Sequence, residues 1–277
     1  MTNDKIIEIT SLCKSFAAVQ ARGRKKARSL APRIIDDLSL GVPNRTIMAL
    51  IGGNAAGKTT LFNLISGFLQ PTSGEISYAT NGDRVSLIGK KPYQISRMGI
   101  GRLFQNDLIF PNMSILDNML VAAEDQRGRS SYSPLRVWCK ENEREIALID
   151  RADRVFEDLF GAGNEFWDRR DKPARDLSFG QRRLLAIARL FMGKYRLILM
   201  DEPTSGINPE YIDKVIRITR RLVAEKGNTV FLIEHNMEVV LKMADFCCFM
   251  SQGKIAAMGT PADVIGNDAV RKTYLGI

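Results

Sequence analysis

A glycine-rich octapeptide in the first quarter of the chain has the residue types and spacing to bind nucleotide phosphates. Residues 52–59 read GGNAAGKT and fit the pattern GxxxxGK[ST], between an apolar run and a helical stretch. Main-chain N–H groups of such a loop converge on phosphate oxygens, Lys58 adds a cation, and the Thr59 hydroxyl can ligate Mg²⁺. A chance glycine-rich turn is the alternative, but it does not account for both flanking elements. The residues expected at the phosphates are Gly52, Gly53, Asn54, Ala55, Ala56, Gly57, Lys58, Thr59 and Thr60.

Two carboxylates stand at the end of another apolar run. Residues 197–202 read LILMDE, so Asp201 and Glu202 emerge at the carboxyl end of a predicted buried strand, where α/β sheets place ligand chemistry. Asp201 is placed to hold the Mg²⁺ shell, and Glu202 is the expected base that orients and deprotonates an attacking water. A strand ending in Asp-Glu is usually structural when it stands alone. Beside a phosphate-binding loop it predicts nucleotide hydrolysis.

Two further segments place polar residues next to a predicted element. His235, the only histidine of the chain, directly follows the run TVFLIE; a lone histidine is more often structural, but here an imidazole could hydrogen-bond a γ-phosphate or the attacking water. In LSFGQ, Ser178 opens a helix, either as its N-cap or as part of a second phosphate site built on the exposed N–H groups. Two phosphate-seeking elements far apart in sequence suggest two copies that share each nucleotide.

Strands and helices must position these residues, and they alternate along the chain. Apolar or alternating runs predict strands, and a period near 3.6 predicts helices. Such alternation indicates a mostly parallel sheet with right-handed crossovers. Strands are predicted over residues 5–16, over 34–53 as two strands joined at Pro43-Asn44, and over 75–79, 196–201 and 229–234; helices are predicted over 59–69, 115–160 with a break at 126–134, 181–192, 210–227 and 237–244.

The composition is that of a folded globular protein, with 45% hydrophobic and 26% charged residues in 277. It contains no run of the roughly 20 apolar residues that cross a bilayer, and its N-terminus lacks the layout of a secretory signal, so a cytosolic protein is expected. Four cysteines without metal-ligand spacing are interpreted as buried small apolar residues. The net charge is +9, and residues 22–33 read RGRKKARSLAPR. That basic stretch is either a solvated loop or a contact with lipid headgroups, a partner or nucleic acid.

The order of the motifs resembles that of an ABC (ATP-binding cassette) ATPase over nearly the whole chain. The glycine-rich loop, Gln105 in GRLFQN, LSFGQ, the Asp201-Glu202 strand end, SGIN and His235 follow one another as in that family. The resemblance implies that Phe16 stacks on adenine and that Gln105 senses Mg²⁺ and the γ-phosphate, acts in catalysis and relays to a membrane subunit. It also implies that Ser178, Gly180 and Gln181 close over the partner copy's ATP, and that residues 205–208 cross the dimer interface.

Finer features resemble one branch of the family, the ATPases of branched-chain amino-acid importers. Residues 101–122, the aromatic residue in LSFGQ, SGINP and the ending GTPADVIGNDAVRKTYLG carry this similarity. Urea and amide importers and the ATPase of lipopolysaccharide export share it. The chain has Gly53 and Ala55 where this branch usually has proline and glycine. If position 55 requires a positive φ, its alanine costs stability.

The expected fold is an α/β P-loop NTPase core of the ABC type, with an N-terminal antiparallel β portion and an inserted α-helical subdomain. The core is predicted over residues 1–109 and 177–277 and the helical subdomain over 110–176. The resemblance implies ATP and Mg²⁺ as cofactors, with Thr59, Gln105 and Asp201 at the metal. It implies a second ATPase subunit, two transmembrane permease subunits docking near Gln105, Phe110, Met113 and Ile115, and a solute-binding protein for an importer. The expected location is cytoplasmic, peripheral on the inner face of the cell membrane.

Two other function classes compete with the transporter interpretation. An ABC-type ATPase that acts on nucleic acid would suit the charge of +9, but the chain has no long heptad run and no zinc-ligand cluster. We therefore expect no nucleic-acid partner. A GTPase or small-molecule kinase would lack LSFGQ, and the guanine-specifying NKxD pattern is missing here. Within the transporter class, import is expected, and a lipid or lipopolysaccharide exporter stays the alternative.

Overall fold

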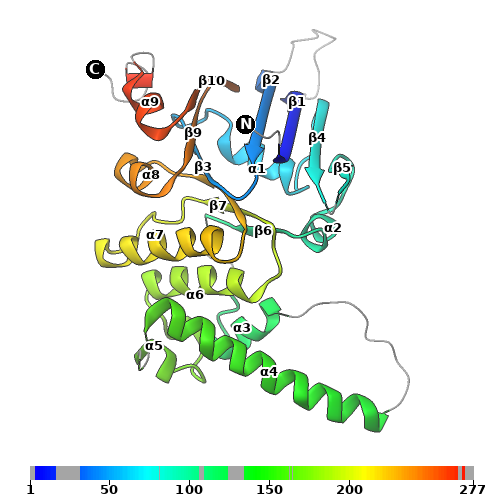
Figure 1. Cartoon of the computed structure of the whole chain (residues 1–277), viewed down its shortest axis with the longest axis vertical. Coiled ribbons are helices and arrows are strands. Elements are labelled where there is room, and N and C mark those ends of the chain that lie inside the picture. The colour runs from blue at the N-terminus through cyan, green and yellow to red at the C-terminus, as the bar shows by residue number, and fades with distance from the viewer. Residues whose placement is uncertain are drawn as a thin grey trace, which may run out of the picture.

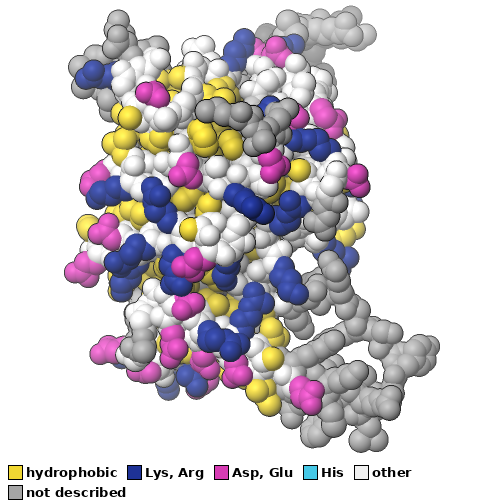
Figure 2. Space-filling model, in the orientation of Figure 1, with side chains coloured by type: hydrophobic (Ala, Val, Ile, Leu, Met, Phe, Trp, Pro, Cys, Tyr) yellow, Lys and Arg dark blue, Asp and Glu magenta, His cyan; other side chains and the backbone are white. Residues whose placement is uncertain are grey.

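The structure is a computed structural model, and it describes residues 4–16, 32–80, 82–105, 109–123, 134–161, 163, 165–267 and 270–271, without the side chains of 134–142 and 144. Residues 22–31 of the basic stretch lie outside these ranges, so both interpretations of that stretch stay predictions. Within the described part, no helix has the length and apolar character needed to cross a membrane. On the face shown in Figure 2, Lys and Arg side chains are interspersed with Asp and Glu.

A six-stranded sheet forms the centre of the molecule, in the order β10-β9-β3-β8-β7-β6 (Figure 1). The pairs from β9 to β6 are parallel, and β10 runs antiparallel to β9. The parallel arrangement confirms the prediction from alternating strands and helices. Its strands are β3 (Ile47–Ile51), β6 (Ile100–Leu103), β7 (Leu197–Asp201), β8 (Thr229–Ile233), β9 (Phe246–Ser251) and β10 (Lys254–Gly259).

Alternating side chains divide the apolar core into two clusters, one on each face of this sheet. Along β3, Ile47, Ala49 and Ile51 belong to one cluster, whereas Met48 and Leu50 belong to the other, as a period of two requires. The first cluster packs against α3 (Ile115–Ala123), α4 (Pro134–Phe160), α6 (Phe179–Met192), α7 (Pro209–Ala224) and α8 (Met237–Met243). The second packs against α1 (Lys58–Ile65) and the second sheet.

The second sheet is antiparallel, in the order β2-β1-β4-β5. It covers the α1 face of the molecule and confirms the predicted N-terminal β portion (Figure 1). Its strands are β1 (Lys5–Ser15), β2 (Arg33–Pro43), β4 (Ser73–Ala79) and β5 (Arg84–Ser86), with the short helix α2 (Pro92–Arg97) following.

Helix α1 ends earlier than predicted. The sequence predicted a helix to residue 69, but α1 ends at Ile65, and Gly67 adopts a φ of +76°. A side chain there would meet the Lys90 carbonyl oxygen at 2.8 Å. Position 67 therefore requires glycine both for its left-handed backbone and for its close contact, and such a residue ends a helix.

Helices occupy the described part of the predicted insertion. They are α3, α4, α5 (Glu165–Asp168) and the 3₁₀ turn η1 (Ala174–Asp176). Phe156 of α4 stacks on Trp167 of α5 with 4.0 Å between ring centroids, and both join the cluster that includes α6. Apolar packing thus continues from these helices into the core, and the boundaries at residues 110 and 176 stay a prediction.

Three of the cysteines have described side chains, and two of these match the expectation. Cys247 and Cys248 are fully buried in β9, and burial raises the pKa of the Cys247 thiol to about 12. Cys13 is half-buried, and its sulfur accepts a hydrogen bond from the Asp37 N–H at 3.3 Å. The side chain of Cys139 lies outside the described part.

The chain ends in β9, β10 and α9 (Pro261–Gly266). Strand β9 pairs with β3 in parallel, beginning at Met48 opposite Phe246. The turn between β9 and β10 reaches back to the glycine-rich loop, because the Gly253 N–H donates to the Ala56 carbonyl at 3.1 Å. The C-terminal strands therefore support the loop expected to hold phosphates.

Candidate active site

Residues 52–57 form a tight loop between β3 and α1, the setting predicted from the octapeptide. Gly57 has a φ of +106°, and a Cβ at that position would lie 2.8 Å from the Ile34 carbonyl oxygen. A Cβ at Gly52 would lie 2.2 Å from the Met250 carbonyl oxygen, whereas one at Gly53 would contact nothing within 4 Å. Two of the three glycines are thus required by the close packing of this loop on neighbouring main chain.

Lys58, the first residue of α1, folds back over the loop. Its ammonium donates to the carbonyl oxygens of Gly52 at 2.7 Å and Gly53 at 2.9 Å. Burial lowers the pKa of Lys58, and the nearby carboxylates of Glu202 and Asp201 oppose that shift. The cation is therefore held at the mouth of the loop beside the two acidic residues, with the exposed side chain of Thr59 next to it in sequence.

Ala55 has a left-handed backbone with a φ of +61°, and its side chain is exposed. This confirms the condition under which the sequence predicted a cost. An L-residue in that region places its Cβ too near the neighbouring carbonyl oxygen, whereas glycine does not.

Gln105, Glu202 and His235 meet at the carboxyl ends of three neighbouring strands. Gln105 Nε2 donates to Glu202 Oε2 at 3.0 Å, and His235 Nε2 lies 2.8 Å from Glu202 Oε1. These residues follow β6, β7 and β8, which are adjacent in the sheet. Parallel strands bring their carboxyl ends to one edge, so segments about 130 residues apart in sequence converge there. Both oxygens of the expected base are thereby oriented by side chains that the sequence had assigned to the same site.

Asp201 is buried beside a cation, with one oxygen available for a ligand. Its side chain is 2% exposed, and Arg102 Nη2 lies 3.6 Å from its Oδ2. Burial raises the pKa of Asp201, and Arg102 acts against that rise. Among the described residues, Asp201 Oδ1 is buried without a hydrogen-bond partner. An orphaned carboxylate oxygen fits a divalent cation, because hard cations prefer oxygen ligands.

The described residues contain no group of three or more His, Cys, Asp or Glu side chains that could hold a metal by themselves. A cation at Asp201 would therefore depend on phosphate oxygens and water in addition to Thr59 and Gln105. Mg²⁺ is commonly bound in this way, through one or two carboxylates plus substrate phosphates.

Two buried charged residues support the site, and the sequence analysis missed both. Glu234 Oε1 accepts from the Thr204 N–H at 3.0 Å and from the Thr204 hydroxyl at 2.6 Å, while its Oε2 accepts from the His235 N–H at 3.1 Å. Arg183 of α6 donates to main-chain carbonyls on β6 and β7 ends. A signal existed for Arg183, because a period of 3.6 places it on the same buried helix face as Ile187.

The segment LSFGQ forms the start of α6. Ser178 is its N-cap: Ser178 Oγ accepts from the Gln181 N–H at 3.3 Å, and Gln181 Oε1 accepts from the Ser178 N–H at 3.0 Å. The capping interpretation is thus confirmed, while the second phosphate site and the role of Gly180 stay predictions. Because α1 and α6 belong to clusters on opposite faces of the sheet, the two phosphate-seeking elements do not face each other within one chain.

Phe16 directly follows β1 and is 43% exposed, with the Lys14 ammonium 5.0 Å from its ring centroid. An exposed aromatic ring is available for stacking on a base. Residues 17–31 lie outside the described part, and the contact with adenine stays a prediction.

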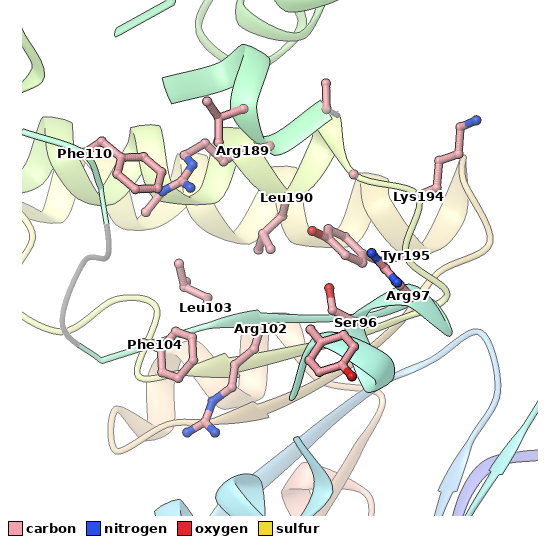
Figure 3. A pocket seen from close by; sticks show the side chains of 16 residues that line it. Ser96, Arg97, Arg102, Leu103, Phe104, Phe110, Arg189, Leu190, Lys194 and Tyr195 are labelled. Atoms are coloured by element: carbon pink, nitrogen blue, oxygen red, sulfur yellow. The ribbon is translucent and has the colours of Figure 1, made fainter. Parts of the chain in front are cut away.

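A groove of about 740 Å³ lies between α2, β6, α3 and α6 (Figure 3). Phe110 lies at one end of it, with the Arg189 guanidinium 5.3 Å from its ring centroid. The residues predicted to dock a permease subunit differ in exposure. Phe110 and Met113 are exposed, but Ile115 is fully buried in the core and therefore cannot take part in a surface contact. The polar residues that line the groove are Tyr93, Ser96, Arg97, Arg102, Arg189, Lys194 and Tyr195.

Comparison with known proteins identifies relatives along almost the entire chain. Residues 35–205 match the family model described as ABC transporter. A probable branched-chain amino acid transport ATP-binding protein of Archaeoglobus fulgidus is 32% identical over 98% of this chain and 96% of its own length. A high-affinity branched-chain amino acid transport ATP-binding protein of Pseudomonas aeruginosa is 31% identical over 98% of both. The lipopolysaccharide export ATP-binding protein of Escherichia coli is 31% identical over 94% of this chain and 98% of its own length.

Solved structures show the same fold. The ADP conformation of an ATP-binding cassette of an ABC transporter matches with a TM-score of 0.75 and 27% identity, covering 99% of both chains. A nucleotide-free cassette matches with the same TM-score and identity over 99% of this chain and all of that one.

Proposed function

The chain belongs to the ABC transporter family as an ATP-binding and ATP-hydrolysing subunit, and on that premise we propose that it powers the import of branched-chain amino acids or a related small polar solute such as urea or an amide. The observation that carries this proposal is the 31–32% identity to two branched-chain amino acid transport ATPases over 98% of the chain. The exporter relative, at 31% identity, keeps lipopolysaccharide export as the second candidate.

The glycine-rich loop binds the nucleotide phosphates in this proposal. The ammonium of Lys58 leaves the carbonyls of Gly52 and Gly53 and pairs with phosphate oxygens, a charge-assisted contact that is stronger than its present ones. Thr59, Gln105 and Asp201 would hold Mg²⁺, which neutralises charge on the phosphates. Phe16 stacks on the adenine ring.

Glu202 acts as the base that takes a proton from the attacking water. Its two oxygens accept hydrogen bonds from Gln105 and His235, and an oxygen that receives the proton must face the water. Each carboxylate oxygen has two lone pairs, so it can face the water while it keeps its present contact. Because Gln105 lies at the end of β6 beside the groove residues Leu103 and Phe104, it is the contact best placed to respond to a docked partner, while His235 holds the other oxygen.

Two copies of the chain, or this chain and a similar one, enclose two ATP molecules. Helix α1, which follows the glycine-rich loop, and helix α6 pack on opposite faces of the sheet, which favours a contact of the Ser178–Gln181 segment with the nucleotide of another copy. Residues 205–208 would lie between the copies. When the two copies close around ATP and reopen after hydrolysis, the helical subdomain would move relative to the central sheet.

The groove in Figure 3 is the site where we place a permease segment. It combines aromatic residues with Arg97, Arg189 and Lys194, and none of the described residues that line it is acidic. A short amphipathic helix with an acidic residue fits this lining, since opposite charges pair and the apolar face covers the rings. The chain would thereby sit on the cytoplasmic face of the membrane, and an importer would add a solute-binding protein outside.

The test is recovery of partners from solubilised membranes with Glu202→Gln protein and ATP, compared with the Lys58→Ala, Glu202→Gln double variant. Recovery of multi-span proteins with the first variant alone supports the transporter complex. ATP-dependent uptake of labelled leucine or urea by the reconstituted complex supports import, whereas extraction of lipopolysaccharide from the bilayer supports export. Recovery of nucleic acid, with binding that weakens steeply as salt rises, overturns both.

A further inference from the structure

The Arg183 side chain is 1% exposed, and it donates hydrogen bonds to main-chain carbonyls at the ends of two strands. Its Nη1 donates to Phe104 O at 2.8 Å and Gln105 O at 3.2 Å, after β6. Its Nη2 donates to Asp201 O at 2.9 Å and to Glu202 O, and its Nε donates to Pro203 O at 3.2 Å. A single guanidinium thus connects the main chain that follows β6 with the main chain at the end of β7, on both sides of the expected base.

The planar guanidinium is suited to this task in a way that an ammonium is not. It carries five N–H donors in a fixed fork, so one rigid group can serve carbonyls that point at it from different segments. A lysine ammonium has three donors around one atom. A lysine at position 183 therefore cannot donate to the carbonyls after β6 and to those at the end of β7 at the same time.

One of the carbonyl groups that accept from Arg183 belongs to a strained residue. Glu202 has a φ of +50°, a left-handed backbone that a non-glycine residue adopts only when its surroundings hold it. Hydrogen bonds from Arg183 to the Asp201, Glu202 and Pro203 carbonyls fix the peptide groups on both sides of that residue. They therefore help to aim the Glu202 carboxylate at Gln105 and His235.

The guanidinium also comes from a different part of the molecule than the residues it holds. Arg183 lies two residues after Gln181, in the first turns of α6, the helix that Ser178 caps. In the proposed two-copy arrangement that helix end contacts the partner copy's nucleotide. A shift of α6 would carry Arg183 with it and displace the main chain at Gln105 and Glu202.

We propose that Arg183 is a positioning residue that couples the nucleotide bound by the partner copy, sensed at the start of α6, to the alignment of Gln105 and Glu202 in its own copy. This proposal rests on the two-copy arrangement proposed above. It assigns Arg183 no contact with ATP, so its loss should affect turnover and cooperativity rather than nucleotide binding.

The test compares Arg183→Lys and Arg183→Gln with Arg151→Lys. Arg151 is a matched control, because its Nη2 donates to the Phe191 carbonyl at 3.0 Å near the opposite end of α6. For Arg183→Lys we expect kcat to fall by roughly 10- to 100-fold, the effect of a small misalignment of reacting groups. The KM for ATP should change by less than about twofold, and the Hill coefficient should fall toward 1. Arg151→Lys should leave all three values within about twofold of wild type.

Hydrolysis by the wild-type protein tests the two-copy arrangement separately from the proposed coupling through Arg183. Hydrolysis that rises more steeply than linearly with protein concentration, with a Hill coefficient above 1, supports the two-copy arrangement. A linear rate with a coefficient of 1 overturns that premise. The coupling is refuted if Arg183→Lys and Arg183→Gln keep the wild-type kcat and Hill coefficient. It is also refuted if Arg151→Lys reduces kcat as strongly, or if thermal unfolding shows that lost activity follows lost folded protein.

Discussion

Replacing Ala55 by glycine should stabilise the protein, although alanine-to-glycine changes usually do the opposite. Ala55 lies in the glycine-rich loop with a φ of +61°. Its methyl group is exposed, so its removal sacrifices little packing. The variant also restores the residue usual in the importer branch that the sequence resembles.

The expected gain is the difference between two opposing effects. The left-handed conformation costs an L-residue roughly 1–2 kcal/mol relative to glycine. Glycine loses more conformational entropy on folding, which costs roughly 0.5–1 kcal/mol relative to alanine. At the middle of both ranges the net stabilisation is about 0.75 kcal/mol, which corresponds to a rise in Tm of about 1.5–3 °C for a chain of this size.

Thermal unfolding without nucleotide measures this difference, with Ala256→Gly as the control. Ala256 is also exposed, but it lies in strand β10 and is not among the residues with positive φ. Ala256→Gly should lower Tm by a similar amount, since glycine in a strand loses entropy without relieving strain. If Ala55→Gly lowers Tm as Ala256→Gly does, the strain argument for position 55 is wrong.

Three further changes test the site. Glu202→Gln should retain ATP binding but slow hydrolysis by roughly 10²–10⁴-fold, the usual contribution of a general base; steady-state ATPase activity at the wild-type rate would refute that role. Lys58→Ala should weaken ATP binding by roughly 10- to 100-fold, as expected for a charge-assisted hydrogen bond; titration calorimetry that shows unchanged affinity would count against the loop as the phosphate site. Glu234→Gln should lower stability by roughly 1–3 kcal/mol, because an amide N–H₂ would face the donors of Thr204 or His235, and it should slow hydrolysis through His235. Unchanged Tm and kcat would contradict this.

The sequence predicted most of the elements whose signals are local, although the apolar run of β9 was missed. The apolar runs before Gly52 and Asp201 form β3 and β7, and the glycine-rich loop begins where the pattern places it. Those strands are buried on both faces, so they appear in the sequence as continuous apolar runs. The adjacent strand β6 was missed because its four residues, IGRL, include a glycine and an arginine. Strand β10 was missed as well, since its alternation of exposed and half-buried residues, KIAAMG, carries little contrast in hydrophobicity.

Arg183 and Glu234, which support the site, were harder to predict because all but one of the partners described above are main-chain atoms, the exception being the Thr204 hydroxyl. Arg183 donates to carbonyls and Glu234 accepts from N–H groups, and every residue except proline offers both. No residue type at a given spacing therefore indicates where such a side chain will bind. A buried position for Arg183 follows from the helical period, but the segments that meet it depend on the folded sheet.

The alignment of the candidate catalytic residues follows from strand register more than from the motifs themselves. Leu103 pairs with Met200, and Asp201 pairs with Ile233, so Gln105, Glu202 and His235 all follow within two residues of aligned strand ends. A slip of one residue would turn each side chain to the opposite face of the sheet. Once the register is set, only the short loops after the strands remain to be fixed. Arg183 and Glu234 hydrogen-bond to those loops, Arg183 to carbonyls and Glu234 to N–H groups. Because Arg183 is part of α6 and Glu234 directly follows β8, a displacement of α6 alone would disturb Gln105 and Glu202 while leaving His235 in place.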